Sequence, residues 1–471
     1  MQLLKEFDYR RFGSSGPIHG YNRIVRLYPP FSVTSLNRSF QQLFHVALLG
    51  ISVFGFLAKY PFASGEDVAN ARLNFLSSAR NDFWGGFAPF FYSIIPNSLL
   101  DANIIYALFY IAMIAAGSMG IYSWIIAQCF QTPWILIASL LSLTYVSLLF
   151  SLDFSRDGSM LAFVWLGFGL FFWLNLKGKG RFWLLVPLLL MVIGFSFRPW
   201  LGLSIFPIFS ILVLKFRLMA KLNSRFVPMV LLCSFFLTLS PFALDRTVGT
   251  IANLEEAYPQ QQVMIMDLSA LTCLSANREV TDKSLFALSQ LSDTESLKKS
   301  EVCDFFYPQS WASVVFYDNS SSGGPNPIRM IRPSEQQLYN AFSKSWRSVI
   351  MEHPKAYLQV KIMLGSQFLF AGDSRSGYRS IWQRVPSFPL DLLRDVRFFS
   401  VAPFVTFLFI YVLRRWNTPS KMELGLISIF YFSNVLLISA AFIGDNQRYL
   451  IPSTLLSLLF LLLSTKANRL E

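Results

Sequence analysis

Long apolar runs separated by short polar stretches dominate the chain. A helix needs about 20 apolar residues to cross the roughly 30 Å of a bilayer's hydrocarbon core. Runs near this length lie at residues 41–58, 102–127, 134–151, 159–176, 182–197, 200–215, 226–244, 398–413, 423–443 and 450–465. The two short runs that meet at Arg198 are also compatible with a re-entrant turn. The pattern predicts an all-α polytopic membrane protein of about ten transmembrane helices.

A more polar stretch, residues 247–397, interrupts these runs between the seventh and eighth predicted spans. Its helical patterns predict a mainly α domain. The clearest helix is expected to begin at Ser334, with Gln337 completing a capping box, and to bury an apolar face that includes Phe342. A second helix, after Pro354, is apolar enough to lie in a membrane interface.

The charge pattern orients the predicted spans. Basic residues gather in the N-terminal tail and in alternate loops; they are Arg10, Arg11, Arg23, Arg26, Arg38, Lys177, Lys179, Arg181, Lys215, Arg217, Lys221, Arg225, Arg414, Arg415 and Lys421. Cytoplasmic loops of membrane proteins carry such an excess. We therefore expect both termini in the cytoplasm and the polar domain outside, and the net charge of +13 reports topology, with no nucleic acid partner.

The expected organisation follows from these two patterns. It is a basic cytoplasmic tail (1–40), an N-terminal transmembrane domain (41–246, with a first loop at 59–101), an extracytoplasmic domain (247–397), three C-terminal spans (398–465) and a cytoplasmic tail (466–471). Hydrophobic residues make up 54% of the chain, which excludes a single soluble domain. The first run begins near Leu43 behind a long basic tail, so we expect a retained anchor and no cleaved signal peptide.

Few residues have the spacing of a redox or metal site. Cys273 and Cys303 both fall in the polar domain, where an oxidising compartment would allow them to pair, although the sequence does not show whether they come within reach. We find no metal-ligand spacing and no nucleotide-binding glycine loop. No cofactor is expected, and a divalent metal is not favoured because arginines surround the acidic residues.

Four polar clusters fall on the non-cytoplasmic face of the predicted topology. Their members are Glu66 and Asp67; Asp153, Arg156 and Asp157 of the FSRDG region; Arg198; and Asp445, Arg448 and Tyr449 of GDNQRY. Ionisable groups near hydrocarbon are costly, so they pair with one another, face a cavity or take part in chemistry. These clusters are therefore the candidate site.

Each cluster also has a structural interpretation. Asp67 completes a capping box with Ser64, a role compatible with that of a general base. The Arg156–Asp157 and Asp445–Arg448 combinations fit local ion pairs as well as contacts to an anionic substrate, and Tyr449 fits an interfacial belt. Arg198 has no acidic residue near it in sequence, which favours a phosphate or carboxylate contact.

Two further features lie in the polar domain. His353 ends the helix predicted from Ser334, where a histidine complements the helix dipole or contacts a ligand. A basic tract precedes the eighth predicted span and fits either anionic lipid headgroups or a track for a lipid phosphate or acceptor glycan; it comprises Arg375, Arg379, Arg384, Arg394 and Arg397.

Several motifs resemble those of the GT-C superfamily of polytopic glycosyltransferases, which use polyprenyl-phosphate sugars. The first loop, with YPFASGEDVANARLNF, places Asp67 or Glu66 in the superfamily's acidic position. FSRDGSM resembles the second-loop cluster, DNQRYLIPSTLL the entry to the last span, and EHPKAYL a segment before the late helices. The resemblance implies a bacterial inner-membrane enzyme with a polyprenyl-phosphate-sugar donor and a glycan, lipid or protein acceptor.

The chemistry of such a transfer requires one base. A lipid phosphate leaves as a stable anion, whereas a glycosidase needs two carboxyl groups to expel a poor leaving group. Asp67, or failing that Glu66, is the expected base, and Arg156, Arg198 or Arg448 the phosphate contact. Two alternatives stay open: a surface-polysaccharide polymerase or ligase, which would depend on arginines and His353, and a transporter or flippase, which would show repeated halves.

Overall fold

The computed structural model describes residues 35–59, 85–94, 102–128, 134–152, 155–177, 183, 185–199, 227–292, 297–306, 326–366 and 456 of the 471-residue chain. Within these ranges the secondary structure is helical and contains no extended strand. The chain is therefore an all-α protein in the part described. Its contacts divide it into two compact units, Met1–Leu49 and Gly50–Glu471, and the packing discussed below lies within the second unit.

Apolar helices occupy most of the predicted spans that fall within the described ranges. They are α2 (Ser35–Lys59), α5 (Ala102–Gln128), α6 (Trp134–Ser151), α7 (Arg156–Leu176), α8 (Leu185–Ser196) and α11 (Val227–Ile251). Among described residues, Asn103–Ala127 and Arg156–Leu174 are long and apolar enough to cross a membrane, while shorter apolar helices lie at Gln41–Leu57, Leu140–Ser151 and Leu185–Ser196. The predicted spans at 200–215, 398–413, 423–443 and nearly all of 450–465 lie outside the described residues.

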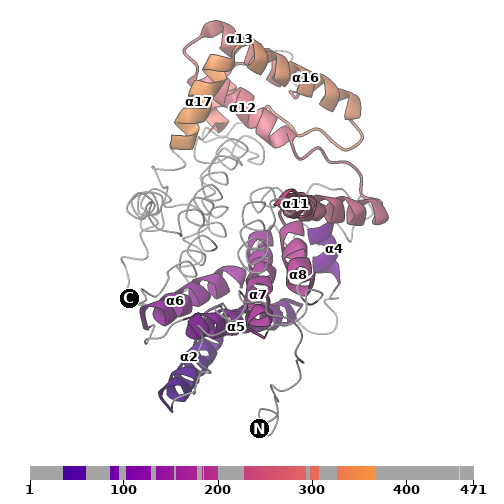
Figure 1. Cartoon of the computed structure of the whole chain (residues 1–471). Helices are drawn as coiled ribbons and strands as arrows, with labels where there is room; N and C mark the ends of the chain where they lie inside the picture. The colour runs from indigo at the N-terminus through magenta and orange to yellow at the C-terminus, as the bar shows by residue number, and fades with distance from the viewer. Residues whose placement is uncertain are drawn as a thin grey trace. The chain divides into compact units, whose positions relative to one another are not determined.

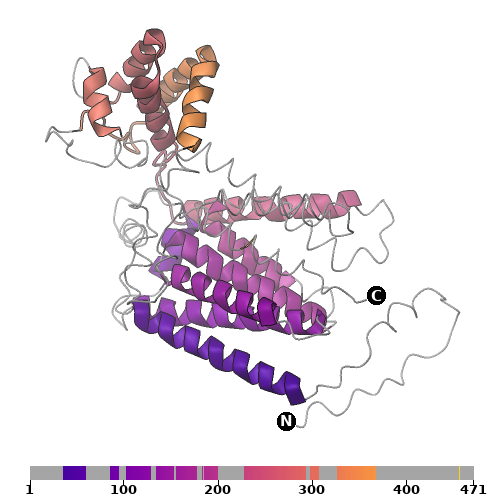
Figure 2. The same ribbon diagram turned by 90° about the vertical axis from the view of Figure 1, so that its left-hand side faces the viewer.

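Helices α5 and α7 pack with their backbones in close contact, as Figures 1 and 2 show from two sides. A Cβ atom added at Gly120 would collide with the backbone of Gly169, and one at Gly169 would collide with that of Gly117. Small residues let the backbones of two helices approach closely and so increase their van der Waals contact. The glycines thus explain why these two helices meet here.

Interhelical hydrogen bonds accompany this glycine contact. Ser118 Oγ on α5 accepts a hydrogen bond from Trp165 Nε1 of α7 at 2.9 Å and lies 2.9 Å from Thr144 Oγ1 of α6. All three side chains are buried. Polar side chains that bond across helices are a second source of cohesion where the surroundings are apolar. One serine therefore joins three helices.

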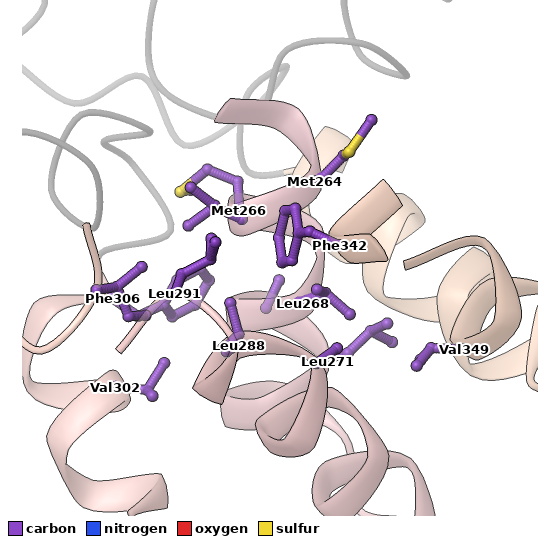
Figure 3. Packing of buried hydrophobic residues seen from close by; sticks show 14 of the residues in the cluster. Met264, Met266, Leu268, Leu271, Leu288, Leu291, Val302, Phe306, Phe342 and Val349 are labelled. Carbon is purple, nitrogen blue, oxygen red and sulfur yellow. The ribbon is translucent and has the colours of Figure 1, made fainter. Parts of the chain in front are cut away.

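A second group of helices, called the helical domain below, follows α11 in the region for which the sequence predicts a polar domain. It contains α12 (Gln261–Leu274), α13 (Arg278–Ser289), α14 (Lys299–Phe305), α16 (Gln336–Glu352) and α17 (Pro354–Ser366). Apolar side chains of α12 lie at the centre and meet those of α13, α14 and α16, as Figure 3 shows for Leu268, Leu271, Leu288, Val302 and Phe342. The structure also joins Cys273 to Cys303 by a disulfide, with Cα atoms 5.6 Å apart, which ties α12 to α14.

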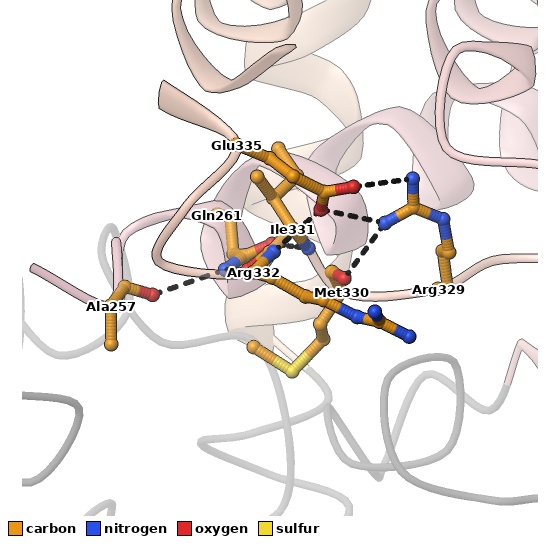
Figure 4. A network of polar contacts seen from close by, with 7 residues as sticks. All are labelled: Ala257, Gln261, Arg329, Met330, Ile331, Arg332 and Glu335. Carbon is orange, nitrogen blue, oxygen red and sulfur yellow. Dashed lines mark hydrogen bonds and ion pairs between the residues drawn. The ribbon is translucent and has the colours of Figure 1, made fainter. Parts of the chain in front are cut away.

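The segment before α16 is fixed by a polar network (Figure 4). The buried Gln261 side chain accepts a hydrogen bond from the Ile331 N–H at 2.6 Å and donates to the Ile331 carbonyl at 3.0 Å. Arg329 donates two hydrogen bonds to Glu335, at 2.8 and 3.0 Å, which lowers the pKa of that carboxyl group. The network provides hydrogen-bond partners for backbone groups of Ile331 and Arg332, which lie outside any helix.

This network corrects the predicted start of the helix. The capping box at Ser334 is wrong: Ser334 lies in a turn, and α16 begins at Gln336. The Glu335 carboxylate accepts from the Arg332 N–H and is bonded to Arg329, and this arrangement stabilises the turn ahead of the helix. The predicted apolar face is confirmed, because Phe342 is buried in the core of the domain.

A buried charge joins α12 to α17. Asp267 is fully buried, forms an ion pair with Lys361 at 2.7 Å, and accepts hydrogen bonds from Tyr357 Oη at 3.1 Å and Trp346 Nε1 at 3.3 Å. Burial raises the pKa of Asp267, and the Lys361 ammonium opposes that rise. Ionised groups taken out of water need such partners.

We predict that Gly120→Ala destabilises the protein. The added methyl group meets backbone atoms that cannot move aside independently, and overpacking of this kind costs about 1–3 kcal/mol. Gly50→Ala is the matched control, because a Cβ there has nothing within 4 Å and alanine favours a helix. Thermal unfolding of the purified protein in detergent measures both. Equal midpoints for the two variants would show that the glycine contact is unimportant.

We predict that Lys361→Met makes stability fall with rising pH. Loss of the cation raises the pKa of Asp267 further, whereas an unfolded aspartate titrates near about 3.9. Between these two values the folded state binds more protons than the unfolded state, so stability declines as pH increases. Unfolding midpoints from pH 4 to 8 test this. Asp267→Asn in the same background should remove the pH dependence, and a parallel decline in the double variant would refute the assignment.

Candidate functional site

The candidate site is built around the start of α7. Asp157 is fully buried in the first turn of this helix and accepts hydrogen bonds from Arg198 Nε at 2.8 Å and Nη2 at 3.1 Å. The two residues are 41 positions apart in sequence. A bidentate guanidinium–carboxylate pair is both strong and directional. It fixes the start of α7 against the end of α8.

Local sequence explains why Asp157 has this position. The Ser155 hydroxyl accepts a hydrogen bond from the Gly158 N–H at 3.0 Å and so caps the helix. A Cβ at Gly158, in the first turn of α7, would lie 2.6 Å from the Phe150 carbonyl oxygen of α6, so the two helices approach too closely there for a larger residue. Asp157 is the second residue of α7, two positions after the cap, where a helix N-terminus stabilises a negative charge.

Arg198 reaches the pair because α8 ends beside the start of α7. The last turn is tightened by hydrogen bonds from the Phe197 N–H to the Gly194 carbonyl and from the Arg198 N–H to the Phe195 carbonyl. Pro199 follows, and proline has no N–H with which to extend the ladder. The Arg198 side chain is 12% exposed, so the pair sits at the edge of the buried region.

Tyrosines connect the end of the predicted first loop to the same place. Tyr92, in α4 (Phe87–Ser93), and Tyr110 of α5 each place their hydroxyl 2.6 Å from Ser159 Oγ, and Ser159 donates to the Ser155 carbonyl at 3.1 Å. All three side chains are buried. The Phe197 ring packs edge-on to Phe91 with centroids 5.0 Å apart. Helix α4 is therefore fixed against both α7 and the end of α8.

Asp245 of α11 is a structural residue that the sequence reading missed. Its Oδ1 accepts hydrogen bonds from the N–H groups of Gly86, at 2.9 Å, and Phe87, at 2.8 Å, at the start of α4. Gly85 has φ +83°, a left-handed conformation that suits glycine. The adjacent glycines Gly85 and Gly86 were the one sequence feature that indicated this contact, because such a pair allows a sharp turn and close backbone approach.

The predicted site residues have three different outcomes. Asp157 and Arg198 are brought together, with Arg156 next to them at the start of α7. His353 belongs to the helical domain, where it is the C-cap of α16 and its Nε2 lies 3.8 Å from Glu279 Oε1. The remaining predicted residues lie outside the described ranges; they are Glu66, Asp67, Asp153, Asp445, Arg448 and Tyr449.

His353 also lines an open pocket of about 540 Å³ at the joint between α16 and α17. Asn277, Lys355 and Gln359 contribute polar groups, and Val280 is among the apolar residues of the lining. This volume is in the range of small-molecule sites. The dipole-complementing role of His353 fits its position as C-cap, and the ligand contact stays a prediction.

The arrangement assigns different chemical capacities to the three charged residues. Both oxygens of Asp157 accept hydrogen bonds from Arg198, so this carboxylate is poorly placed to take a proton from a substrate. Arg156, Asp157 and Arg198 together carry a formal charge of +1, which favours an anion nearby. Among described residues, no group of three or more His, Cys, Asp or Glu side chains is placed to hold a metal ion. No protein-family model, curated protein or solved structure matches the chain.

We predict that Asp157→Asn destabilises the protein strongly. Removal of one partner leaves the largely buried Arg198 guanidinium without the Asp157 carboxylate, and breaking a buried pair in this way costs up to about 3–5 kcal/mol. The double variant Asp157→Asn, Arg198→Gln should cost less than the sum of the two single variants, because neither charge then remains. Unfolding midpoints of the four proteins form a thermodynamic cycle. Strict additivity would show that the two residues do not interact.

Proposed function

We propose that this protein is a membrane-embedded glycosyltransferase of GT-C type, which moves a sugar from a polyprenyl-phosphate donor to an acceptor hydroxyl on the extracytoplasmic face. The observation that carries the proposal is the Tyr92–Ser159 contact beside the Asp157–Arg198 pair. It brings the end of the first loop to the start of the second-loop cluster. The second-loop segment carries FSRDGSM, which resembles the superfamily, and Tyr92 follows the first-loop motif of residues 60–75, which lies outside the described ranges.

The proposed topology has about ten spans, a mainly α extracytoplasmic domain between the seventh and eighth, and cytoplasmic termini. Apolar helices at α5, α6, α7 and α8 support the spans in this part of the chain. The Cys273–Cys303 disulfide supports an oxidising location for the helical domain. The alternating basic loops support the orientation, and a bacterial inner membrane fits all three features.

The proposed reaction transfers one proton and one glycosyl group. Asp67, with Glu66 in reserve, accepts the proton of the acceptor hydroxyl as its oxygen bonds to the sugar's anomeric carbon. The bond from that carbon to the phosphate oxygen breaks, and the lipid phosphate leaves with the electron pair. Arg156 stabilises the phosphate, since a guanidinium matches its geometry with paired donors. Arg198, which donates to Asp157, acts by positioning the start of α7.

Other predicted contacts complete this proposal. Arg448, with Asp445 and Tyr449 beside it in sequence, is a second candidate for the lipid phosphate or the sugar. No cofactor is required by the chemistry, because the leaving group is already activated as a phosphate ester. The reaction needs the acceptor glycan, lipid or protein to present its hydroxyl at the membrane surface.

We predict that Asp67→Asn abolishes sugar transfer without loss of protein. An amide cannot accept the acceptor's proton, and general-base loss costs about 10²–10⁴-fold in rate. Glu66→Gln is the matched control, with a smaller effect expected. The assay uses purified protein, a panel of polyprenyl-phosphate sugars and product detection by mass spectrometry.

The same assay separates the competing interpretations. An active Asp67→Asn enzyme would refute the base assignment. Loss of activity in His353→Ala, with Asp67→Asn unaffected, would favour a polysaccharide polymerase or ligase. Lipid-linked sugar moved across vesicles with no new glycosidic bond would favour a transporter.

A further inference from the structure

Helix α17 has two faces that differ in their surroundings. Val360 and Leu364 are buried against the core of the helical domain, and Lys361 and Tyr357 on the same side bind the buried Asp267. These contacts hold α17 on α12, which the disulfide at Cys273 ties in turn to α14. One side of α17 therefore packs against the helical domain (Figure 1).

The opposite face of α17 is exposed and carries three apolar residues together with the polar Lys355 and Gln359. Leu358 and Ile362 are about one helical turn apart, and they are 60% and 61% exposed. Met363 is 37% exposed next to them, and Lys355 precedes them by one turn on the same face. We call Lys355, Leu358 and Ile362 the outer stripe. Exposed aliphatic residues in a row along one helix indicate a surface that something else covers.

The charge of α17 indicates what covers the outer stripe. The helix PKAYLQVKIMLGS contains two lysines and no acidic residue. Its buried-side lysine, Lys361, is engaged by Asp267, whereas Lys355 is exposed at the end of the outer stripe. A lysine stem can lie along an apolar surface while its ammonium reaches the phosphates of lipid headgroups. Apolar residues flanked by a cation are typical of helices that lie in a membrane interface.

The sequence beyond α17 points to the same partner. Residues 367–370 read QFLF, the basic tract with Arg375 and Arg379 follows, and the predicted eighth span begins at 398. This continuation tethers α17 to a bilayer and adds cations that attract anionic lipids. In the proposed topology a lipid surface therefore lies near α17.

We propose that the outer stripe of α17 docks onto the anionic lipid surface of the membrane and holds the helical domain against it. Leu358 and Ile362 enter the boundary between headgroups and acyl chains, and Lys355 binds lipid phosphate. This inference rests on the membrane embedding in the proposed function and is independent of sugar transfer.

The test uses the full chain in proteoliposomes that contain phosphatidylglycerol. Cys129 and Cys233 are replaced by alanine, and Leu358→Cys or Ile362→Cys carries an environment-sensitive fluorophore. Ser300→Cys, an exposed position on α14, is the matched control. A spin label on shallow acyl positions should quench the fluorophore at 358 and 362 severalfold more than at 300. Lys355→Glu, or neutral lipid alone, should reduce that difference.

The outcomes separate this inference from the function. Carbonate washing first shows whether the chain is embedded; a chain that washes off overturns both the embedding and the docking. An embedded chain whose label at 358 is quenched no more than at 300 overturns the docking alone. Protection from aqueous iodide without quenching by lipid would mean that a protein, a second copy or another partner, covers the outer stripe, and this also overturns the proposal.

Discussion

A buried charge must meet an opposite charge, and the pair of Asp157 and Arg198 satisfies this requirement with two hydrogen bonds. The remaining contacts of the site depend on where this pair forms. It aligns the start of α7 with the end of α8, so Phe197 meets the rings of α4 and Ser159 meets Tyr92. Had either helix been shifted by one turn, about 5.4 Å, the bidentate geometry would be lost. The pair therefore sets the register of three helices.

The same requirement has a different consequence in the helical domain. Asp267 is buried on α12, and its partners Lys361, Tyr357 and Trp346 come from α17 and α16. Apolar contacts are non-directional, whereas the ion pair and the phenol hydrogen bond require Lys361 and Tyr357 to face Asp267. This network thereby decides which side of α17 faces inward and leaves Leu358 and Ile362 outward. Specificity of this kind is the best-attested use of buried polar groups.

The length of the apolar runs predicted the helices well, because a helix forms its backbone hydrogen bonds between residues that are close in sequence. The apolar runs 102–127 and 134–151 coincide with helices α5 and α6. Pairing could not be predicted in the same way: Arg198 has no acidic residue nearby in sequence, and its partner is visible only once α7 and α8 pack. The role of Asp245 could not be predicted for the same reason, because it accepts a hydrogen bond from the Phe87 N–H, 158 residues away in sequence. The wrong capping box at Ser334 shows that a local motif does not reveal the contacts that the Glu335 carboxylate makes with Arg329 and the Arg332 N–H.

The charge balance of the site bears on what it can do. The charges of Asp157 and Arg198 cancel. Their ion pair therefore shapes the site without a net charge that would repel an anion. Arg156 adds one positive charge beside the pair, at a helix N-terminus whose own dipole is positive. In the proposed function both would attract a lipid phosphate, whereas a carboxylate placed there would have its oxygens occupied by guanidinium donors, as those of Asp157 are. A base contributed by a different segment, as Asp67 would be, avoids this conflict, and separation of the anion contact from the proton acceptor is what transfer from a phosphate donor requires.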